Sequence, residues 1–380
     1  MQSVVLFLLN GAGPMHMEAA RWVEYGSSAN SFIKSMPETR FAQTGNVFGQ
    51  LTDSAAAYTS IACGVKTANN KFGQDKYSEN CYNLFERAAD LGVRTGIVSK
   101  TSLDESELIS LLSHNNVFTT TPDLVMSPGT VIFNSTQLSF QQITAESKLL
   151  NETALPFQAH VQLTKFIDSA DKITLETLVF SALNVLSKDQ KPFILVVNAM
   201  TVQQLAQDLV GEAIEAELIG AKLIQYCTKN KIALVTSGTF EFGGLTLPDT
   251  MIALKDALPA TVKDTEKNQA RKTRFASIQA GLVTASDKQT NAMVLVGSTH
   301  KMNKINHIKQ INQHVFDILL GKTDKVTGGS DKDMIRRQKM AKKEQTKAVK
   351  PEQQNELYIG VGIGAGIGIA GIAAYFLLKK

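Results

Sequence analysis

An acidic residue and a hydroxyl residue stand directly before a run of small residues in the first part of the chain. Asp53 and Ser54 precede three alanines, and Gly64 closes the run. Acid and hydroxyl side chains cap helix starts, alanine favours helices and glycine ends them, so the pattern predicts a helix that starts at this pair. A hydroxyl there faces the positive end of the helix dipole, which suits an attacking oxygen or a bound phosphate. The same pattern also fits an ordinary capped helix that does no chemistry.

The segment 50–70, with Asp-Ser-Ala, a small-residue run and Cys-Gly-Val-Lys, resembles the nucleophile segment of alkaline phosphatases. Under this resemblance, Ser54 matches the nucleophilic serine of the family. The likeness continues in the same order and spans roughly residues 3–320, through the segments 4–13, 84–98, 173–183, 192–197 and 233–237. It implies an alkaline-phosphatase-like α/β fold, a three-layer sandwich with a mainly parallel central sheet.

Catalysis in the alkaline phosphatase family depends on two zinc ions and one magnesium ion, which Asp, Glu and His side chains hold. The ions lower the pKa of the serine, hold the phosphoryl oxygens and activate the water of the second step. The positions that match the family's ligands carry mostly neutral residues here, which cannot supply the charge that holds a dication. These positions are Asn10, Asn198, Gln203, Gln207, Gly238 and Thr239. Only His300 matches a zinc ligand of the family.

Other acids near these positions could still form a metal site with fewer ligands than the family's site. An insertion would shift the register so that Asp208 and Glu212 replace the two glutamines. Glu105 and Glu107 lie near the family's magnesium-associated loop, although a solvated helix start with acids in its first turn explains them as well. The family's phosphate-binding arginine falls near Phe118, where the sequence has no lysine or arginine.

The missing ligands predict a catalytically inactive member of the family, in which Ser54, Asp53 and His300 are vestigial and no cofactor is bound. Removing one preorganised transition-state partner typically costs about 10²- to 10³-fold in rate, and here most of the set is replaced together. The alternative is a divergent phosphomonoesterase that keeps zinc or magnesium in a reduced site and uses Ser54 as its nucleophile.

Apolar β-branched runs alternate with amphipathic stretches along the first 320 residues. Parallel strands that are buried on both faces have such continuous apolar runs, so we expect a mainly parallel sheet between helical layers. The expected strands are 4–9, 94–98, 193–197 and 232–236, and the expected helices are 175–186, 212–227 and 303–320.

The cysteines and the last three histidines give no metal motif. The three cysteines lie far apart without a CxxC pair, so neither a disulfide framework nor a zinc knuckle is indicated. His300, His307 and His314 recur every seven residues, a spacing of about 10 Å along a helix, which is too wide for one ion. We therefore expect these histidines on the surface.

Basic residues gather behind the expected α/β domain. Residues 322–350 contain ten Lys or Arg and four acids, while the whole chain has a net charge of only +4. The preceding part is therefore slightly acidic and lacks the charge of a nucleic-acid binder. We expect three regions: an alkaline-phosphatase-like α/β domain at 1–321, a basic linker or arm at 322–356, and a transmembrane helix at 357–378.

The C-terminal tail carries the strongest local signal. Residues 357–378 are uncharged, and as a helix they would be about 33 Å long, which matches a bilayer core. Tyr358 and Tyr375 near its ends are typical interfacial aromatics. Its glycines permit close approach of another membrane helix, and a merely glycine-rich span fits equally well. A lipid-anchor signal is the competing interpretation, but that route needs a secretory signal, whereas the N-terminal segment is predicted to be a buried strand.

The tail and the domain together suggest a membrane-bound accessory protein. Moderate hydrophobicity with flanking lysines favours a mitochondrial membrane, with the endoplasmic reticulum second. Because a single helix cannot specify a partner, we expect the domain to contact other subunits of a membrane complex, and a homodimer is also compatible with the sequence. No nucleic-acid partner is expected.

Truncation after Gln354 is expected to release the domain into the soluble fraction, because the uncharged segment 357–378 is then missing. Fractionation of expressing cells, a high-salt wash of the membranes and immunoblotting measure where each form lies. The full-length chain should stay in the washed pellet. A truncated form that stays there without any partner would contradict the anchor.

Overall fold

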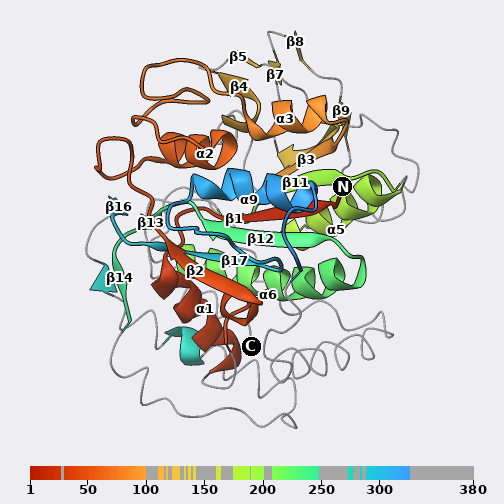
Figure 1. Ribbon diagram of the computed structural model, residues 1–380. Helices are drawn as coiled ribbons and strands as arrows, with labels where there is room; N and C mark the ends of the chain where they lie inside the picture. Colours follow the sequence, from red (N-terminus) through yellow and green to blue (C-terminus); the bar gives the residue numbers. More distant parts are fainter. Residues whose placement is uncertain are drawn as a thin grey trace, which may run out of the picture.

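The computed structural model describes most of the expected α/β domain (Figure 1). The described residues are 1–26, 30–99, 110–114, 117–118, 122–128, 132–133, 136–137, 140–142, 160–163, 174–188, 190–200, 208–247, 273–276, 283–284 and 288–325. Within these ranges no helix is long and apolar enough to cross a membrane. The basic arm beyond residue 325 and the expected transmembrane segment 357–378 lie outside the described residues.

A nine-stranded sheet in the order β2-β17-β12-β1-β11-β3-β6-β10-β9 runs through the described part of the chain. Its strands are β1 (Val4–Leu9), β2 (Glu38–Ala42), β3 (Arg94–Ser99), β6 (Leu124–Pro128), β9 (Phe140–Gln142), β10 (His160–Leu163), β11 (Phe193–Asn198), β12 (Ala233–Gly238) and β17 (Val294–Ser298). From β12 to β9 every neighbouring pair is parallel, whereas β17 is antiparallel to both β12 and β2. The sheet is therefore mixed and mainly parallel.

Short antiparallel pairs lie beside the main sheet. They are formed by β13 (Glu241–Phe242) with β16 (Gln289–Thr290), β14 (Leu245–Thr246) with β15 (Val283–Thr284), β4 (Ser113–His114) with β5 (Val117–Phe118), and β7 (Ile132–Phe133) with β8 (Thr136–Gln137). In Figure 1, β13 and β16 lie on the left, on the side away from the N-terminus.

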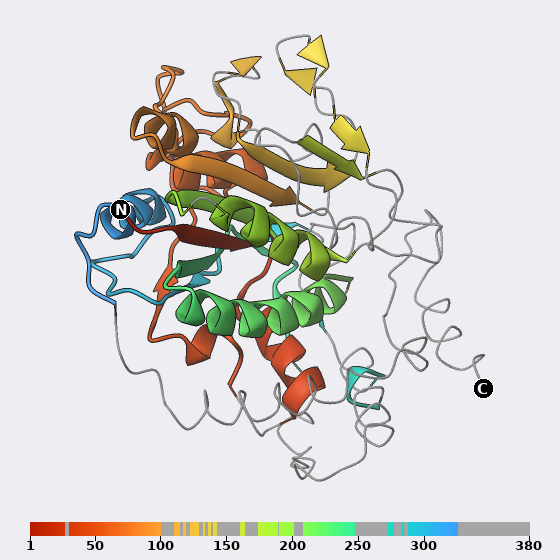
Figure 2. The same ribbon diagram turned by 90° about the vertical axis from the view of Figure 1, so that its right-hand side faces the viewer.

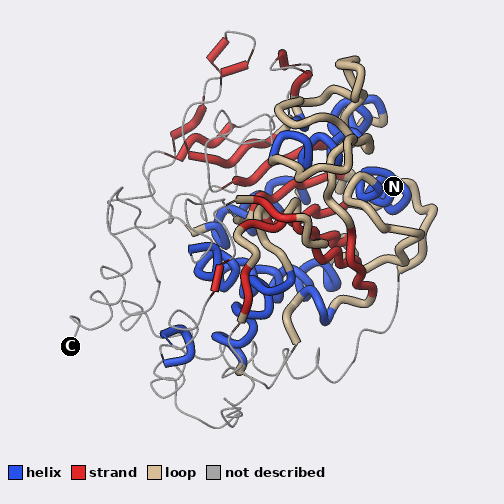
Figure 3. Tube along the Cα trace, turned by 90° about the vertical axis from the view of Figure 1, so that its left-hand side faces the viewer, coloured by secondary structure: helices blue, strands red, loops and turns tan. Residues whose placement is uncertain are grey.

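Helices cover both faces of the sheet, which gives three layers. One face carries α1 (Pro14–Tyr25), α5 (Leu175–Ser187) and α6 (Asp208–Lys229), and the other carries α2 (Ser54–Cys63), α3 (Leu84–Asp90) and α9 (Gln310–Leu319). The 3₁₀ turn η1 (Ile33–Ser35) packs on β17. Figure 2 shows α5 and α6 side by side in front of the sheet, and Figure 3 shows the strands in red between helices in blue.

The strand β1 lies at the centre of the buried core. All six of its residues are buried, and it pairs in parallel with β11 on one side and β12 on the other. Aliphatic burial on both faces is the reason that the sequence here is a continuous apolar run. The predicted strand 4–9 is confirmed, and the strands expected near 94, 193 and 232 agree with β3, β11 and β12 to within two residues.

Close contacts join α6 to β1 through Phe32. The Phe32 ring packs edge-on against the Phe7 ring of β1, with 5.9 Å between the ring centroids. Gly220 of α6 faces the same ring, and a Cβ atom there would lie 2.6 Å from two ring atoms. The carboxylate of Glu217 also accepts a hydrogen bond from the Phe32 backbone N–H at 2.6 Å. Only a glycine at position 220 allows the helix to approach this closely without a shift of the ring.

The last described helix, α9, is shorter than the sequence suggested. We expected a helix at 303–320, but α9 begins at Gln310. The Gln310 side chain accepts hydrogen bonds from the backbone N–H groups of Asn306 and His307, at 2.8 and 3.0 Å. These bonds hold the preceding loop in a non-helical turn, because a polar side chain competes with the helical ladder for the backbone.

The expectation that the last three histidines lie on the surface is wrong. His300, His307 and His314 are all buried. The ring of His307 bonds the backbone oxygen of Gly45 at 2.9 Å, and the ring of His314 bonds the hydroxyl of Ser298 at 2.9 Å. Burial lowers the pKa of both His307 and His314 to about 4, so both rings are neutral at neutral pH.

Stability is expected to fall as the pH drops from about 6.5 towards 4. In that window the unfolded histidines bind protons while folded His307 and His314 do not, so each costs roughly 1.4 kcal/mol per pH unit. His314→Gln retains a polar side chain but cannot titrate. Urea unfolding at several pH values should show a shallower pH dependence for this variant than for the parent chain. Equal slopes in the two proteins would contradict the assignment.

Candidate functional site

The carboxyl ends of the three central parallel strands meet at one edge of the sheet. In the strand register, Leu8 of β1 pairs with Asn198 of β11, and Leu9 pairs with Gly238 of β12. Asn10 directly follows β1, and Thr239 directly follows β12. Open α/β sheets bind their ligands at this edge. Four of the positions that the family resemblance assigned to metal ligands are therefore brought together.

The amides at this edge are bonded to neutral neighbours. The side-chain oxygen of Asn10 accepts a hydrogen bond from the Thr239 hydroxyl at 2.8 Å. The side-chain oxygen of Asn198 accepts one from the Tyr58 hydroxyl at 2.9 Å. Asn10, Asn198, Tyr58 and Thr239 are all buried. The amide oxygens thus satisfy buried hydroxyl donors, which is an arrangement that stabilises a core without a cation.

The helix α2 places Ser54 and Asp53 as the sequence predicted. Ser54 is the first residue of α2, and Asp53 is its N-cap. One carboxylate oxygen of Asp53 accepts from the backbone N–H of Ala56 at 2.7 Å, and the other accepts from that of Asn70 at 2.5 Å. Both oxygens therefore hold backbone groups, so Asp53 positions the helix start and the following loop.

Tyr58 connects α2 to the sheet edge. It lies one helical turn beyond Ser54, and its hydroxyl is the group that bonds Asn198 of β11. The Ser54 side chain is half-buried, and among the described residues no histidine or carboxylate hydrogen-bonds to its hydroxyl. Ser54 therefore lies at a helix start, and no general base among the described residues contacts its hydroxyl.

A buried pair that the sequence did not single out lies at the same edge. Glu241 follows β12 by three residues, and its carboxylate accepts from the backbone N–H groups of Gly244 and Leu245, each at 3.2 Å, and from the Thr290 hydroxyl. A Cβ atom on Gly13 would lie 2.1 Å from the Glu241 side chain. The sequence could have identified Glu241 by its position alone, because an acid that follows a predicted parallel strand lies at the edge of the sheet where ligands bind.

His16 is the second member of the pair. Its Nδ1 atom accepts a hydrogen bond from the Gly13 backbone N–H at 3.2 Å and lies 3.9 Å from an oxygen of Glu241. Burial lowers the pKa of His16 to about 4. The ring is therefore neutral at neutral pH, and its contact with Glu241 is not an ion pair. The proton then belongs on Nε2, for which the described part of the chain offers no acceptor.

The structure separates His300 from the other candidate positions. Because β17 is antiparallel to β12, its carboxyl end reaches the amino end of the parallel strands. The backbone N–H of Thr299 bonds Leu234 at 3.0 Å, and the His300 ring bonds the Gln2 side chain at 3.1 Å. Gln2 precedes β1, whereas Asn10 follows it. His300 therefore lies at the opposite edge of the sheet from Asn10.

The described donor set does not fit the metal centre that the family resemblance implies. Within the described ranges, no group of three or more His, Cys, Asp or Glu side chains is placed to hold a metal ion. Gln203, Gln207, Glu105 and Glu107 lie outside the described residues. Phe118 belongs to the short strand β5, which pairs only with β4 among the described strands and is not part of the main sheet.

Comparisons with known proteins agree with this architecture. The family model for alkaline phosphatase matches residues 1–151. Alkaline phosphatase 4 of Bacillus subtilis is 24% identical over 289 residues, which cover 64% of this chain and 63% of that protein. Alkaline phosphatase of Escherichia coli is 30% identical over 123 residues, which cover 30% of this chain and 26% of that protein. The chain thus matches less than two thirds of the length of either relative.

Solved structures extend the likeness to most of the chain. The alkaline phosphatase from the Antarctic bacterium TAB5 superposes with a TM-score of 0.61 at 15% identity, over 84% of this chain and 97% of that one. The Thermus thermophilus alkaline phosphatase gives a TM-score of 0.62 at 12% identity, over 89% of this chain and 95% of that one. At these identities the structures show the shared fold alone. Together with the family model over residues 1–151 and the curated relatives, they support an alkaline-phosphatase-like protein.

Proposed function

We propose that this chain is a catalytically inactive alkaline-phosphatase-like protein, held in a membrane by residues 357–378, that serves as a structural or accessory subunit of a membrane protein complex. The observation that carries the first part is the chemistry of the edge where ligands bind in such sheets. Asn10 and Asn198 stand where the family resemblance places carboxylates, and each amide oxygen is bonded to a neutral hydroxyl.

The replacements weigh against metal-assisted phosphoryl transfer for an electrostatic reason. Zinc and magnesium are held by anionic oxygens and imidazole nitrogens. Gly238 has no side-chain donor, and Thr239 donates its hydroxyl to Asn10. Ser54 alone is an alcohol of very high pKa, and a helix N-terminus does not replace a base or a metal. Because each missing transition-state partner costs about 10²- to 10³-fold, the expected residual rate is negligible.

The fold does not require the lost chemistry. The packing of α6 against Phe32 and the burial of β1 depend on apolar contacts away from the sheet edge. A superfamily fold can therefore persist as a scaffold after its site has changed, because function depends on the site and stability on the core.

The accessory role rests on the sequence beyond the described residues. Residues 357–378 have the length and the lack of charge of a membrane span. The basic arm at 322–356 would favour an anionic membrane surface or an acidic partner, at roughly 1 kcal/mol per well-placed cation before salt screening. A mitochondrial membrane is favoured and the endoplasmic reticulum is second, on the moderate hydrophobicity and flanking lysines of the tail.

The second candidate is a divergent, membrane-anchored phosphomonoesterase. It is favoured by one observation, the placement of Ser54 at the first position of α2, directly after the N-cap residue Asp53. The two candidates differ in metal content and in the effect of removing the Ser54 hydroxyl.

Purified full-length protein is expected to hold no stoichiometric zinc or magnesium and to hydrolyse no phosphomonoester above background, because anionic ligands are replaced at the sheet edge. Inductively coupled plasma mass spectrometry and a p-nitrophenyl phosphate assay with added zinc and magnesium measure both properties. Ser54→Ala is the matched control, and it should behave like the parent chain. About two zinc ions per chain, with activity that Ser54→Ala abolishes, would establish the phosphomonoesterase instead.

Full-length protein solubilised in mild detergent is expected to migrate with a large complex, because the single tail helix cannot itself supply the partner contacts of the domain. Native gel electrophoresis of membranes from the source cells, followed by immunoblotting, measures its size. The control is the chain truncated after Gln354. It should no longer associate with the membrane, but its domain can still bind its partners. Migration of the full-length chain as a lone monomer would refute the accessory role.

A further inference from the structure

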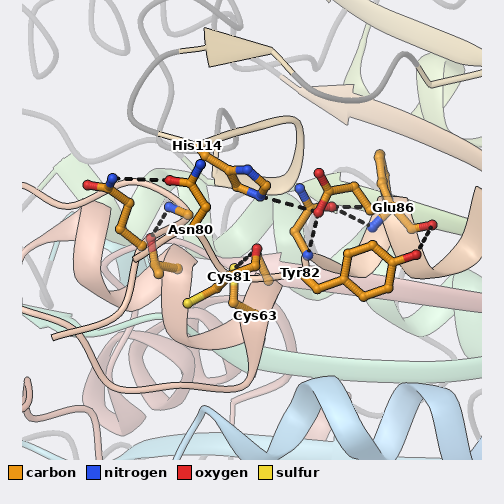
Figure 4. Close-up of polar contacts among 12 residues, drawn as sticks. Cys63, Asn80, Cys81, Tyr82, Glu86 and His114 are labelled. Carbon is orange, nitrogen blue, oxygen red and sulfur yellow. Dashed lines mark hydrogen bonds and ion pairs between the residues drawn. The ribbon is translucent and has the colours of Figure 1, made fainter. Parts of the chain in front are cut away.

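Two of the three cysteines, far apart in sequence, are neighbours in the fold. Cys63 is the last residue of α2, and Cys81 lies in the loop that leads to α3. The Cys63 sulfur lies 3.7 Å from the backbone oxygen of Cys81, to which its thiol donates. Figure 4 shows the two side chains next to each other, with Tyr82, Glu86 and His114 nearby. The sequence spacing gave no sign of this pair.

The loop between the two cysteines is held in place from several sides. The Cys81 backbone N–H bonds Gly73 at 2.8 Å. The Thr59 hydroxyl of α2 accepts from the Gly73 N–H at 3.0 Å and donates to the backbone oxygen of Lys71 at 2.8 Å. A Cβ atom on Gly73 would lie 2.2 Å from the backbone oxygen of Ser113, so the loop packs tightly on β4 as well. The approach of the two thiols is therefore fixed by the surrounding backbone.

The two thiols differ in acidity. A hydrogen bond from Cys63 lowers the pKa of Cys81, although its partial burial and the charges of Asp75 and Glu79 act in the opposite direction. The pKa of Cys63 is raised well above its usual value, first by the hydrogen bond with Cys81, then by burial and by the charges of Cys81 and Glu86. Half-buried Cys81 is thus the thiol that ionises first, and Cys63 is the protonated thiol beside it.

We propose that Cys63 and Cys81 form a redox-sensitive dithiol, which a hydroperoxide converts to an intramolecular disulfide. In the first step the Cys81 thiolate attacks one peroxide oxygen, so that an S–O bond forms, the O–O bond breaks, and an alcohol, or water from hydrogen peroxide, leaves after protonation. In the second step the Cys63 sulfur attacks the Cys81 sulfenic acid. The S–S bond forms and hydroxide leaves with the Cys63 proton as water. Two thiols lose two electrons in total, and the peroxide gains them.

The disulfide would fasten the loop that also holds the start of α2. Between the two cysteines, Asn70 donates its backbone N–H to the Asp53 carboxylate, and the Asn69 side chain accepts from the Asp53 N–H at 3.2 Å. The loop thus runs from the C-terminal end of the helix to its N-terminal end and back. A covalent bond between residues 18 apart in sequence removes conformational freedom from the unfolded chain, which is expected to raise the melting temperature by about 5 °C.

Peptide mapping of the oxidised full-length protein tests the proposal. The chain is reduced, freed of reductant, exposed to graded hydrogen peroxide, denatured and alkylated with N-ethylmaleimide. Trypsin then separates Cys63 in peptide 41–66 from Cys81 in peptide 77–87, and it leaves Cys227 in peptide 223–229. Oxidation should cross-link the first two peptides, lower the intact mass measured before alkylation by about 2 Da and be reversed by dithiothreitol. Buried Cys227 is the internal control and should remain fully alkylated.

Single substitutions assign the roles of the two thiols. Cys63→Ser should leave a Cys81 sulfenic acid that dimedone traps, without the rise in melting temperature, whereas Cys227→Ser should cross-link like the parent chain. Cys81→Ser should leave Cys63 largely unreactive. The proposal is overturned if peptides 41–66 and 77–87 remain separate after oxidation, if the cross-link is intermolecular, or if Cys227 is oxidised as fast as Cys81. None of these readouts depends on phosphatase activity or on the membrane tail.

Discussion

The burial of β1 between β11 and β12 is the constraint on which the rest of this structure depends. Six consecutive apolar residues lie in the core with parallel neighbours on both sides. The register that this pairing imposes fixes what lies at each edge of the sheet. It places Asn10 beside the ends of β11 and β12, and it places Gln2 beside His300 at the other edge. Apolar burial of this kind supplies most of the folding free energy and is insensitive to the chemistry at the edges.

The helix α2 links the central sheet to the loop between the two cysteines. Its N-terminal end is capped by Asp53, its middle reaches the sheet edge through the Tyr58 hydroxyl, and its C-terminal end carries Cys63. In the proposed scaffold these contacts stabilise the fold. Ser54 is then an ordinary residue of the helix and takes no part in catalysis. The same helix would be stiffened by the proposed disulfide, since the loop between the two cysteines bonds both its N-cap residue Asp53 and Thr59 in its middle.

The buried histidines and Glu241 show how burial decides what a titratable residue does. His16, His307 and His314 are neutral at neutral pH because burial disfavours the charged form of each ring and lowers its pKa. Glu241 holds a turn through backbone N–H groups and a hydroxyl. Residue types that look catalytic in a sequence can therefore serve as hydrogen-bonding parts of the core. Their roles follow from the partners that the fold brings to them.

The sequence by itself determined the central strands, the three-layer α/β class and the start of α2, because burial pattern, helix propensity and capping are local properties. It also identified the neutral residues at Asn10, Asn198, Gly238 and Thr239. It did not determine the start of α9, because the Gln310 side chain accepts a hydrogen bond from the Asn306 backbone N–H, and this bond overrides the helical pattern. Tertiary structure alone decided that His300 lies away from Asn10, that His16 meets Glu241, and that Cys63 meets Cys81. These contacts depend on the direction of the strands and on the packing of the loops. Neither can be read from the spacing of residues along the chain.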